Sequence, residues 1–599
     1  MTGAYKPNSR DLIKADFANS LSSTNLKSAL LWYLGLQKRE FFIGTIAKGG
    51  SADLLTMHAL SKSLLGLLGL LRTVRQLRYN STKEIINYAN RRDIIAEQPD
   101  TYYPTIRELR STIPVIRVSD FIAKFSNVPS QALNASAQDT VQLEGKIRSI
   151  RKSGKGLYFM DLIQDEAKVQ IYASNKLLGM SKDEFADIHM FIRKGDHVTC
   201  AGNAYKTNVG ELTLRATSPV RVASPCLNFV TLPDKVRDRS LINGNRVMNY
   251  LVDDMLKQKI HVKSAVTQAI RNFFLNDDFT EVQTPILSGA GTGANAEPFY
   301  TYLKALQAEK LQLRVAPELW LKKLVISGFD KVFEIGSNFR NEGIDATHNP
   351  EFLTCEFYRS FTSLPQLMAI TEDLFTHIYR ELEKKRNTLP ILDQTLPELS
   401  ALAEGGFRKV EFIPGIEERT GVKLPSVLDS ESLITYYEEI GLELPTQKNP
   451  SSLLDNLSGT YLESLSEESP NTPIFIYNQP SLMSPLAKSA IIDYGGRKYD
   501  ISLRFEMFIN GKEYVNSYEE ENSPFSQSEK FLLQQQNKKE FQDNESLIPD
   551  WNYVKLMEYG LPPTGGWGCG IDRLSMLFSG ALRIEDVLTF GTLRDVVRQ

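Results

Sequence analysis

The sequence has few cysteines, no long apolar run and almost no net charge. Four cysteines occur among 599 residues and none forms a Cys-x-x-Cys pair, which argues against a disulfide framework and against a structural zinc site. No segment reaches the ~18 apolar residues of a membrane-spanning helix, so membrane insertion is not expected. Since the formal net charge is −3, any binding of nucleic acid must depend on a local basic patch.

A chain of this length exceeds what one hydrophobic core can organise, so we expect at least two domains. Within 136–230 the runs VQLEGKIRSI, GLYFMDLI and KVQIYA are short, rich in β-branched and aromatic residues, and separated by turn residues. This spacing predicts a small closed β-barrel. The preceding residues, 81–135, mix a helical pattern with prolines and indicate a lead-in segment rather than a domain.

The longer part, 231–599, mixes helical and strand-like stretches. VKSAVTQAIRNFF repeats apolar residues at steps of three and four, which predicts an amphipathic helix, and EVQTPIL after it is a β-type run. Residues from about 380 to 470 indicate a helical insertion, and strand-like runs return from about Tyr477. Together these patterns predict an α+β fold.

The N-terminal part carries a targeting pattern. The stretch MHALSKSLLGLLGLLRTVRQLRYNSTK begins at Met57 and is amphipathic, basic and hydroxyl-rich. It contains no acidic residue, and the first one after it is Glu84. This composition predicts a mitochondrial transit peptide over 57–80, and the alternative is a surface helix with an apolar stripe. Acidic residues within 1–56 would spoil a signal read from Met1, so we expect an untranslated or atypical extension there. The expected location is the mitochondrial matrix, with the cytoplasm as the alternative.

The stretch FRNEGIDATHNPEF joins two strand-like runs, KVFEIGSNFRNEG and HNPEFLTCEFY, which predicts an antiparallel hairpin. Side chains alternate along a strand, so Arg340 and Glu342 should share a face, as should Glu356 and Tyr358. An arginine there can clamp a phosphate or carboxylate, a glutamate can accept from an exocyclic amine, and Phe352 can cover a flat base. The alternative is a surface hairpin with paired charges.

A glycine-rich stretch near the C terminus, GLPPTGGWGCGIDRLSML, leads into a helical run. Glycines permit close backbone approach to a ligand, and Arg573 at the start of the helix adds a second cation. Such runs also occur in dinucleotide sites or at tight packing positions, so this stretch alone decides little.

These stretches resemble the class II aminoacyl-tRNA synthetases. FRNEG with HNPEF is similar to motif 2 of that family, GGWGCGIDRL to motif 3, and the helix leading into EVQTPIL to motif 1, which forms the dimer interface. The lysyl-tRNA synthetases match best, since TLPDKVRDRS, GANAEPF, RVAPELWLKKL and NSYEEEN are also similar. The resemblance runs from about residue 105 to the C terminus. It implies an N-terminal OB-fold barrel and a catalytic domain built on an antiparallel sheet flanked by helices.

The resemblance also implies the residues of an ATP site. Arg340 and Arg573 are the candidate catalytic residues. Arg340 would bind the ATP α-phosphate and the amino-acid carboxylate. Glu342 would read the adenine amine, and His348 would lie near the phosphates. Phe352 and Arg573 would sandwich the adenine ring. Because the amino-acid carboxylate is the nucleophile, catalysis would consist of positioning and charge neutralisation.

The family's metal-binding positions fall on Glu506 and Glu513, which would hold Mg²⁺. A pocket selective for lysine should offer buried carboxylates with hydrogen-bonding neighbours, whereas an aspartate-specific relative would need cations there. Trp567 and Cys569 depart from the motif 3 pattern by placing two larger side chains between its glycines. The implied lysine-binding residues are Glu356, Tyr358, Asn516, Tyr518 and Glu520 for the side chain, and Gly293 and Glu318 for the α-amino group.

For the barrel, the resemblance implies binding of the tRNA anticodon. KIRSIRKSGK has five basic residues in ten and precedes two aromatic residues, which suits phosphate contacts beside a stacking platform. The resemblance places Tyr158 at the base-stacking position, with Arg151, Gln170 and Glu211 as further contacts. For Tyr158 and Phe159 the alternative is a place in the barrel core, and both cannot face the same side.

We therefore expect a homodimeric lysine–tRNA ligase that acts on L-lysine, ATP and tRNA(Lys) in mitochondrial translation. One alternative is an aspartyl or asparaginyl enzyme, which the acidic pocket disfavours. Another is a ligase that lysylates something other than tRNA, which the anticodon-type domain disfavours. A catalytically silent RNA-binding protein would normally have lost ATP contacts that this sequence retains.

Overall fold

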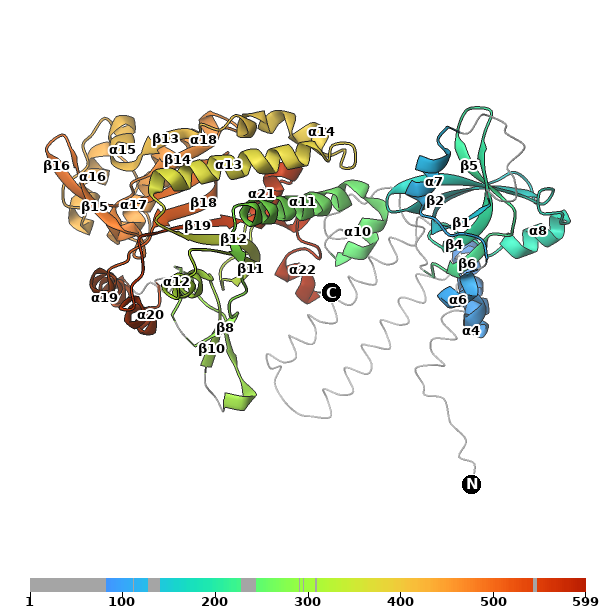
Figure 1. The fold of residues 1–599 in the computed structure, drawn as a ribbon, viewed down its shortest axis with the longest axis horizontal. Helices are drawn as coiled ribbons and strands as arrows, with labels where there is room; N and C mark the ends of the chain where they lie inside the picture. The colour runs from blue at the N-terminus through green and yellow to red at the C-terminus, as the bar shows by residue number, and fades with distance from the viewer. Residues whose placement is uncertain are drawn as a thin grey trace, which may run out of the picture. The chain divides into compact units, whose positions relative to one another are not determined.

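The computed structural model describes residues 82–598 apart from 111, 128–139, 228–243, 290, 295, 307–309 and 542–546. The expected extension over 1–56 and the transit peptide over 57–80 lie outside the described residues. The chain forms two compact units, Met1–Thr231 and Leu232–Gln599 (Figure 1). Among the helices of the described residues, none is both long and apolar enough to cross a membrane.

The first unit contains a closed β-barrel, as the sequence predicts. Its strands follow the order β1-β2-β3-β5-β4-β6, and a further pairing of β1 with β4 closes the barrel. Neighbours pair antiparallel except for the parallel pair β3–β5. The strands are β1 (Val141–Lys152), β2 (Leu157–Gln164), β3 (Ala167–Ser174), β4 (His197–Lys206), β5 (Leu212–Ala216) and β6 (Arg221–Ser224).

Helices from the expected lead-in segment pack onto this barrel. Val118 and Phe121 are fully buried in the barrel core. Arg91 donates to Asp196 at 2.7 Å, and both side chains are buried. The described part of this segment therefore contributes to the hydrophobic core of the first unit. The described helices of this unit are α4 (Thr82–Glu97), α5 (Pro99–Tyr102), α6 (Ile106–Leu109), α7 (Val118–Phe125) and α8 (Lys182–His189).

The second unit is built on an eight-stranded sheet of order β13-β14-β17-β18-β19-β12-β11-β7. The strands from β14 to β11 pair antiparallel, as expected, whereas the outer pairs β13–β14 and β7–β11 are parallel. The strands are β7 (Thr280–Glu281), β11 (Lys331–Phe339), β12 (Glu351–Ser360), β13 (Arg408–Glu411), β14 (Ile474–Tyr477), β17 (Arg504–Ile509), β18 (Lys512–Glu519) and β19 (Thr564–Gly570).

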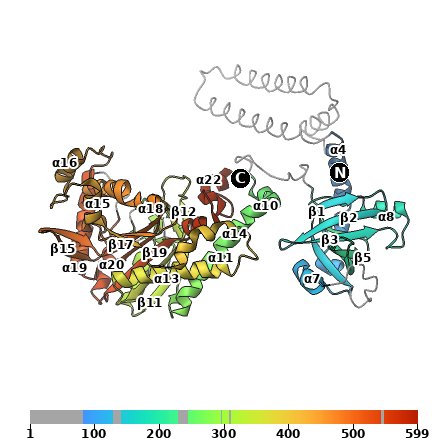
Figure 2. The ribbon, with the colours of Figure 1, turned by 90° about the horizontal axis from the view of Figure 1, so that it is seen from above.

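Three helices, α11 (Asp254–Asn276), α13 (Leu364–Glu383) and α21 (Ile571–Ser579), cover one face of this sheet (Figures 1 and 2). The apolar stripe predicted for α11 is buried, with Val262, Val266 and Ile270 fully enclosed in the main core. The Asp253 carboxylate caps the helix by accepting from two backbone N–H groups of the first turn.

The region expected as a helical insertion is mostly helical; its first part packs into the main core, and its helices from Phe412 onward share a second core with β14 and with β16 (Arg497–Ser502). Its elements are α14 (Leu392–Thr395), η3 (Pro397–Ala403), α15 (Phe412–Thr420), α16 (Ser430–Ile440), α17 (Pro450–Ser458), the π-helix η4 (Gly459–Glu463) and α18 (Leu465–Glu468). The remaining described helices are α10 (Arg246–Val252), η2 (Lys304–Leu306), α12 (Glu318–Ile326), η5 (Ser481–Met483), α19 (Pro524–Phe541), α20 (Trp551–Met557), η6 (Ile584–Asp586) and α22 (Leu593–Arg598). The remaining strands are β8 (Leu287–Ser288), β9 (Tyr300–Tyr302), β10 (Lys310–Leu313), β15 (Ser489–Tyr494) and β16 (Arg497–Ser502).

Candidate active site

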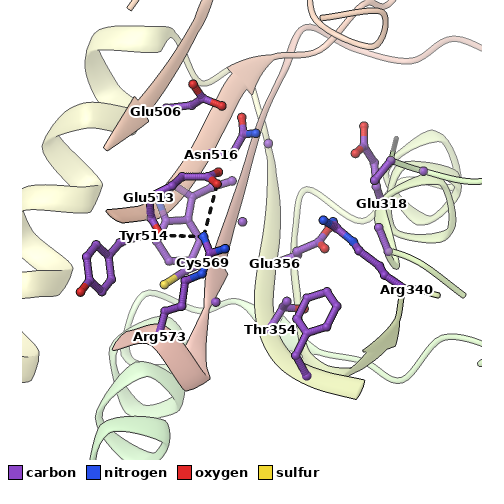
Figure 3. A pocket seen from close by; sticks show the side chains of 18 of the residues that line it. Glu318, Arg340, Thr354, Glu356, Glu506, Glu513, Tyr514, Asn516, Cys569 and Arg573 are labelled. Atoms are coloured by element: carbon purple, nitrogen blue, oxygen red, sulfur yellow. Dashed lines mark hydrogen bonds and ion pairs between the residues drawn. The ribbon is translucent and has the colours of Figure 1, made fainter. Parts of the chain in front are cut away.

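A cavity of about 460 Å³ lies against strands β12, β17, β18 and β19, on the face opposite the covering helices. It brings together side chains from the β11–β12 hairpin, α12, β17, β18 and the start of α21. In Figure 3 two groups lie on its two sides: Glu318, Arg340 and Glu356, and Glu506, Glu513 and Arg573. The predicted residues that line it are Gly293, Glu318, Arg340, Glu342, His348, Phe352, Glu356, Tyr358, Glu506, Glu513, Asn516, Tyr518 and Arg573.

The β11–β12 hairpin is shorter than expected. Strand β11 ends at Phe339, so Arg340 and Glu342 belong to the connecting loop and strand alternation does not set their direction. Backbone hydrogen bonds shape this loop instead, since Arg340 N–H donates to the Pro350 carbonyl at 2.9 Å. The Arg340 guanidinium lies 5.2 Å from the centre of the Phe352 ring. The loop thus places a cation beside an aromatic ring, a pair suited to an anionic ligand with a flat base.

His348 connects this loop to α21. Its Nδ1 lies 2.8 Å from Asp345 Oδ2, and its Nε2 lies 2.6 Å from Arg573 Nη2. A guanidinium can only donate, so Nε2 accepts and Nδ1 carries the proton. Burial would raise the pKa of Asp345, but hydrogen bonds from the Thr347 N–H and from His348 lower it to about 2. Arg573 also donates to the Glu513 carbonyl at 3.0 Å. His348 and Arg573 are therefore both fixed beside the hairpin loop.

The other end of the cavity is acidic. Burial, with the nearby Glu318 carboxylate adding to it, raises the pKa of Glu356 to about 8. The Tyr358 hydroxyl donates to Glu356 at 3.3 Å, and the Tyr518 hydroxyl donates to Glu318 at 2.7 Å. Arg504 holds the Asn516 side chain through its Oδ1 at 3.0 Å. These hydroxyls and carboxylates form an end of the cavity that suits a cationic ligand.

Glu520 is buried behind the acidic end of the cavity and does not line the cavity surface. One carboxylate oxygen lies 1.9 Å from the position that a Cβ on Gly566 would occupy, so only glycine leaves room for it. Glu520 forms an ion pair at 2.5 Å with Lys322, which sequence reasoning missed. The available signal was the spacing of Lys322, one helical turn after Glu318 in α12.

The outer face of the barrel carries an aromatic surface. Phe159 stacks on Tyr172 with ring centres 5.3 Å apart, and Arg151 lies 6.0 Å from the Phe159 ring. The Gln170 amide in β3 donates to Glu211, in the loop before β5, at 3.3 Å. Phe159 and Tyr172 are half-buried beside the exposed Arg151 and form a surface of the kind that stacks on nucleobases, whereas Gln170 is buried.

Tyr158 does not belong to that surface, which corrects the expectation from the sequence. It is 4% exposed and packs inside the barrel against Phe185 and His189. Because neighbouring side chains on a strand point to opposite faces, the inward turn of Tyr158 directs Phe159 outward. The aromatic ring available to a base is therefore that of Phe159.

Comparisons with known proteins agree with this geometry. A family model described as tRNA synthetases class II (D, K and N) matches residues 238–594, and a model of an OB-fold nucleic acid binding domain matches residues 141–220. The mitochondrial lysine–tRNA ligase of Schizosaccharomyces pombe is 38% identical over 515 residues, covering 84% of this chain and 93% of the relative. The chain belongs to the class II lysyl-tRNA synthetases. The family thus accounts for both units, the OB-fold barrel and the catalytic domain.

Two further relatives show the breadth of this likeness to the lysyl-tRNA synthetases. The mitochondrial lysine–tRNA ligase of Saccharomyces cerevisiae is 38% identical and covers 83% of this chain and 90% of its own length. The lysine–tRNA ligase of the bacterium Aquifex aeolicus is 35% identical and covers 76% of this chain and 73% of its own length. Mitochondrial and bacterial synthetases therefore resemble the chain to a similar degree.

In this synthetase, alternation along β19 accommodates the two large residues of motif 3. Trp567 stacks on Phe357 with ring centres 5.3 Å apart, and its Nε1–H donates to Thr371 at 3.0 Å, both on the helix-covered side. Cys569 belongs to the same core, and burial raises the pKa of its thiol. Their bulk therefore lies on the helix-covered side of the strand, while the intervening Gly568 faces Glu356 on the cavity side.

Class II synthetases generally use ATP with Mg²⁺, and the acidic pair in β17 and β18 fits such an ion. Burial raises the pKa of Glu506 to about 7; Arg504 opposes this rise and the Glu513 carboxylate adds to it. A cation held by these carboxylates would relieve their repulsion. Because Mg²⁺ commonly binds through one or two carboxylates together with substrate phosphates, this donor set suits it.

Proposed function

We propose that the chain ligates L-lysine to tRNA(Lys) for mitochondrial translation, through a lysyl-adenylate intermediate. The observation that carries the substrate is the acidic end of the cavity, where Glu318, Glu356 and Glu520 gather within one buried region. An ammonium group would be paired there, whereas the carboxylate of aspartate would be repelled.

In the first step a lysine carboxylate oxygen attacks the α-phosphorus of ATP. The bond to the bridging oxygen of the β-phosphate breaks, and pyrophosphate leaves. Arg340 would pair with both the lysine carboxylate and the α-phosphate, while Phe352 and Arg573 would hold the adenine ring that Glu342 recognises. His348 would lie near the outer phosphates. The side chains thus act by orientation and charge neutralisation rather than by covalent chemistry.

Glu506 and Glu513 would hold Mg²⁺, which when bound supplies positive charge to the phosphates. In the second step the terminal ribose hydroxyl of the tRNA attacks the lysyl carbonyl carbon, and AMP leaves. The outer face of the barrel, with Phe159, Gln170 and Glu211, would bind the anticodon and so select the tRNA.

Amino-acid-dependent ATP–pyrophosphate exchange tests this proposal, using protein that begins near Asn80. Lysine, aspartate and asparagine are compared side by side, and exchange is expected with lysine alone. Exchange with aspartate or asparagine would overturn the assigned specificity. Folded protein with no exchange would favour a silent RNA-binding role.

Mitochondrial action rests on the pattern of residues 57–80 and on the two yeast relatives named as mitochondrial ligases. Sequencing the N terminus of the natural protein from purified mitochondria should find a start near Asn80, and an intact Met1 would contradict the proposal. We also propose a homodimer formed through the motif 1 region, because class II synthetases dimerise there. Sedimentation equilibrium of the same protein should give twice the chain mass.

A further inference from the structure

The acidic end of the cavity contains a buried cation, Lys322, that the proposed chemistry does not use. Its side chain is fully enclosed, and its Nζ lies 2.5 Å from Glu318 Oε1 and 2.5 Å from Glu520 Oε2. Burial opposes the charge of the ammonium, but these two carboxylates outweigh it and raise the pKa of Lys322. A charge of this kind is stable in a protein interior only when it is paired.

Lys322 uses one oxygen of each carboxylate. On Glu318, Oε1 accepts both from Lys322 and from the Tyr518 hydroxyl at 2.7 Å. Among the described residues neither Glu520 oxygen has a partner with full hydrogen-bond geometry, but Oε2 forms the ion pair with Lys322 and Oε1 forms none. Oε1 lies where a Cβ on Gly566 would be, and Gly566 lines the cavity. An unused acceptor is therefore buried on the ligand side of Glu520.

The charges at this end also distinguish one kind of ligand. Glu318, Glu356 and Glu520 bring three negative charges when ionised, and Lys322 neutralises one of them. Two negative charges remain for a ligand, and free lysine carries two ammonium groups. Its carboxylate would pair with Arg340 as proposed above. An amino acid with one ammonium group would leave one of these carboxyls without a cation, so that this carboxyl would keep its proton and add no ion pair to the binding.

We propose that Lys322 is a positioning residue that makes the cavity selective for a diamino acid. It holds Glu318 and Glu520 by one oxygen each, so that these two carboxylates and Glu356 together leave two negative charges for the two substrate ammonium groups. This inference rests on the proposed lysine activation and adds a residue that does not touch the substrate.

The test compares wild type with Lys322→Met and Lys322→Gln in lysine-dependent ATP–pyrophosphate exchange. Both replacements keep the approximate length of the side chain and remove its charge. We expect KM for lysine to rise at least about 30-fold, because two buried carboxylates lose their fixed partner. KM for ATP should stay within about threefold, since the hairpin and Arg573 are untouched. A purely structural defect would not separate the two constants in this way.

Lys323→Met is the matched control. Lys323 follows in the same helix and forms an ion pair with Asp550 at 2.7 Å, away from the cavity. This variant should keep both KM values.

Three outcomes would overturn the inference: unchanged KM for lysine in either Lys322 variant, parallel rises of both KM values, or loss of folding in both Lys322 variants while Lys323→Met folds. If wild type itself shows no exchange with lysine, the proposed function fails first, and the two failures are thereby distinguished.

Discussion

Lysine binding should tighten as the pH rises through neutrality, because Glu356 must lose a proton before it can pair with an ammonium group. Burial, with Glu318 adding to it, raises the pKa of Glu356 to about 8 in the empty cavity. A carboxyl with this pKa is ionised to about 3% at about pH 6.5 and to about 76% at about pH 8.5, whereas the ε-ammonium of lysine stays charged throughout. The apparent dissociation constant for lysine should therefore fall about 25-fold over that range.

Isothermal titration calorimetry at each pH measures this constant directly. Repeating the titration at about pH 7 in two buffers of different ionisation enthalpy counts the released protons, which should number about 0.9 per site. The control is Glu356→Gln, which preserves the shape and removes the titrating carboxyl. Glu356→Gln should bind lysine more weakly than wild type. Its dissociation constant for lysine should change by less than about threefold between about pH 6.5 and about pH 8.5.

Titration of lysine itself is common to both proteins and cancels in the comparison. The reasoning would be refuted if wild type changed by less than about threefold, or if Glu356→Gln kept the wild-type slope. In either case the proton that accompanies lysine binding would have to come from another group at the site.

Three further predictions concern single side chains. Gly566→Ala should raise KM for lysine at least about 100-fold in pyrophosphate exchange, because the new Cβ would lie 1.9 Å from the Glu520 carboxylate, and retained lysine affinity would contradict this. Phe159→Ala should raise KM for tRNA in aminoacylation by about 10- to 100-fold while pyrophosphate exchange stays normal, because one base-stacking ring is lost. An unchanged KM for tRNA would exclude that role. Tyr158→Ala should instead lower the free energy of unfolding of the barrel by about 3 kcal/mol in chemical denaturation, since it empties a core position, and an unchanged midpoint would contradict its burial.

The sequence predicts elements well where one periodicity decides the outcome. Val262, Val266 and Ile270 follow the helical repeat, and all three are buried in α11. Strand alternation also requires Tyr158 and Phe159 to face opposite sides, but it does not say which of them faces inward. That choice depends on what fills the barrel, here Phe185 from a helix that lies between β3 and β4 in the chain.

Parts of the site depend on contacts that no local pattern contains. Arg340 was expected on a strand, yet the strand ends one residue earlier and backbone hydrogen bonds across the hairpin position it. Glu318 and Lys322 are one helical turn apart and visible as a pair, but their third partner, Glu520, lies about 200 positions further along the chain. A buried charge network of this kind becomes apparent only when the sheet and α12 are placed together.

Strand β19 has a consequence for how damage to this enzyme would be detected. Its successive residues face opposite sides of the sheet. Gly566 and Gly568 leave space on the cavity side, whereas Trp567 and Cys569 pack in the core under the helices. A substitution at one of the two glycines should change substrate affinity, and a substitution at Trp567 or Cys569 should change the melting temperature. A survey that scored only one of these properties would judge half of the strand to be tolerant of mutation.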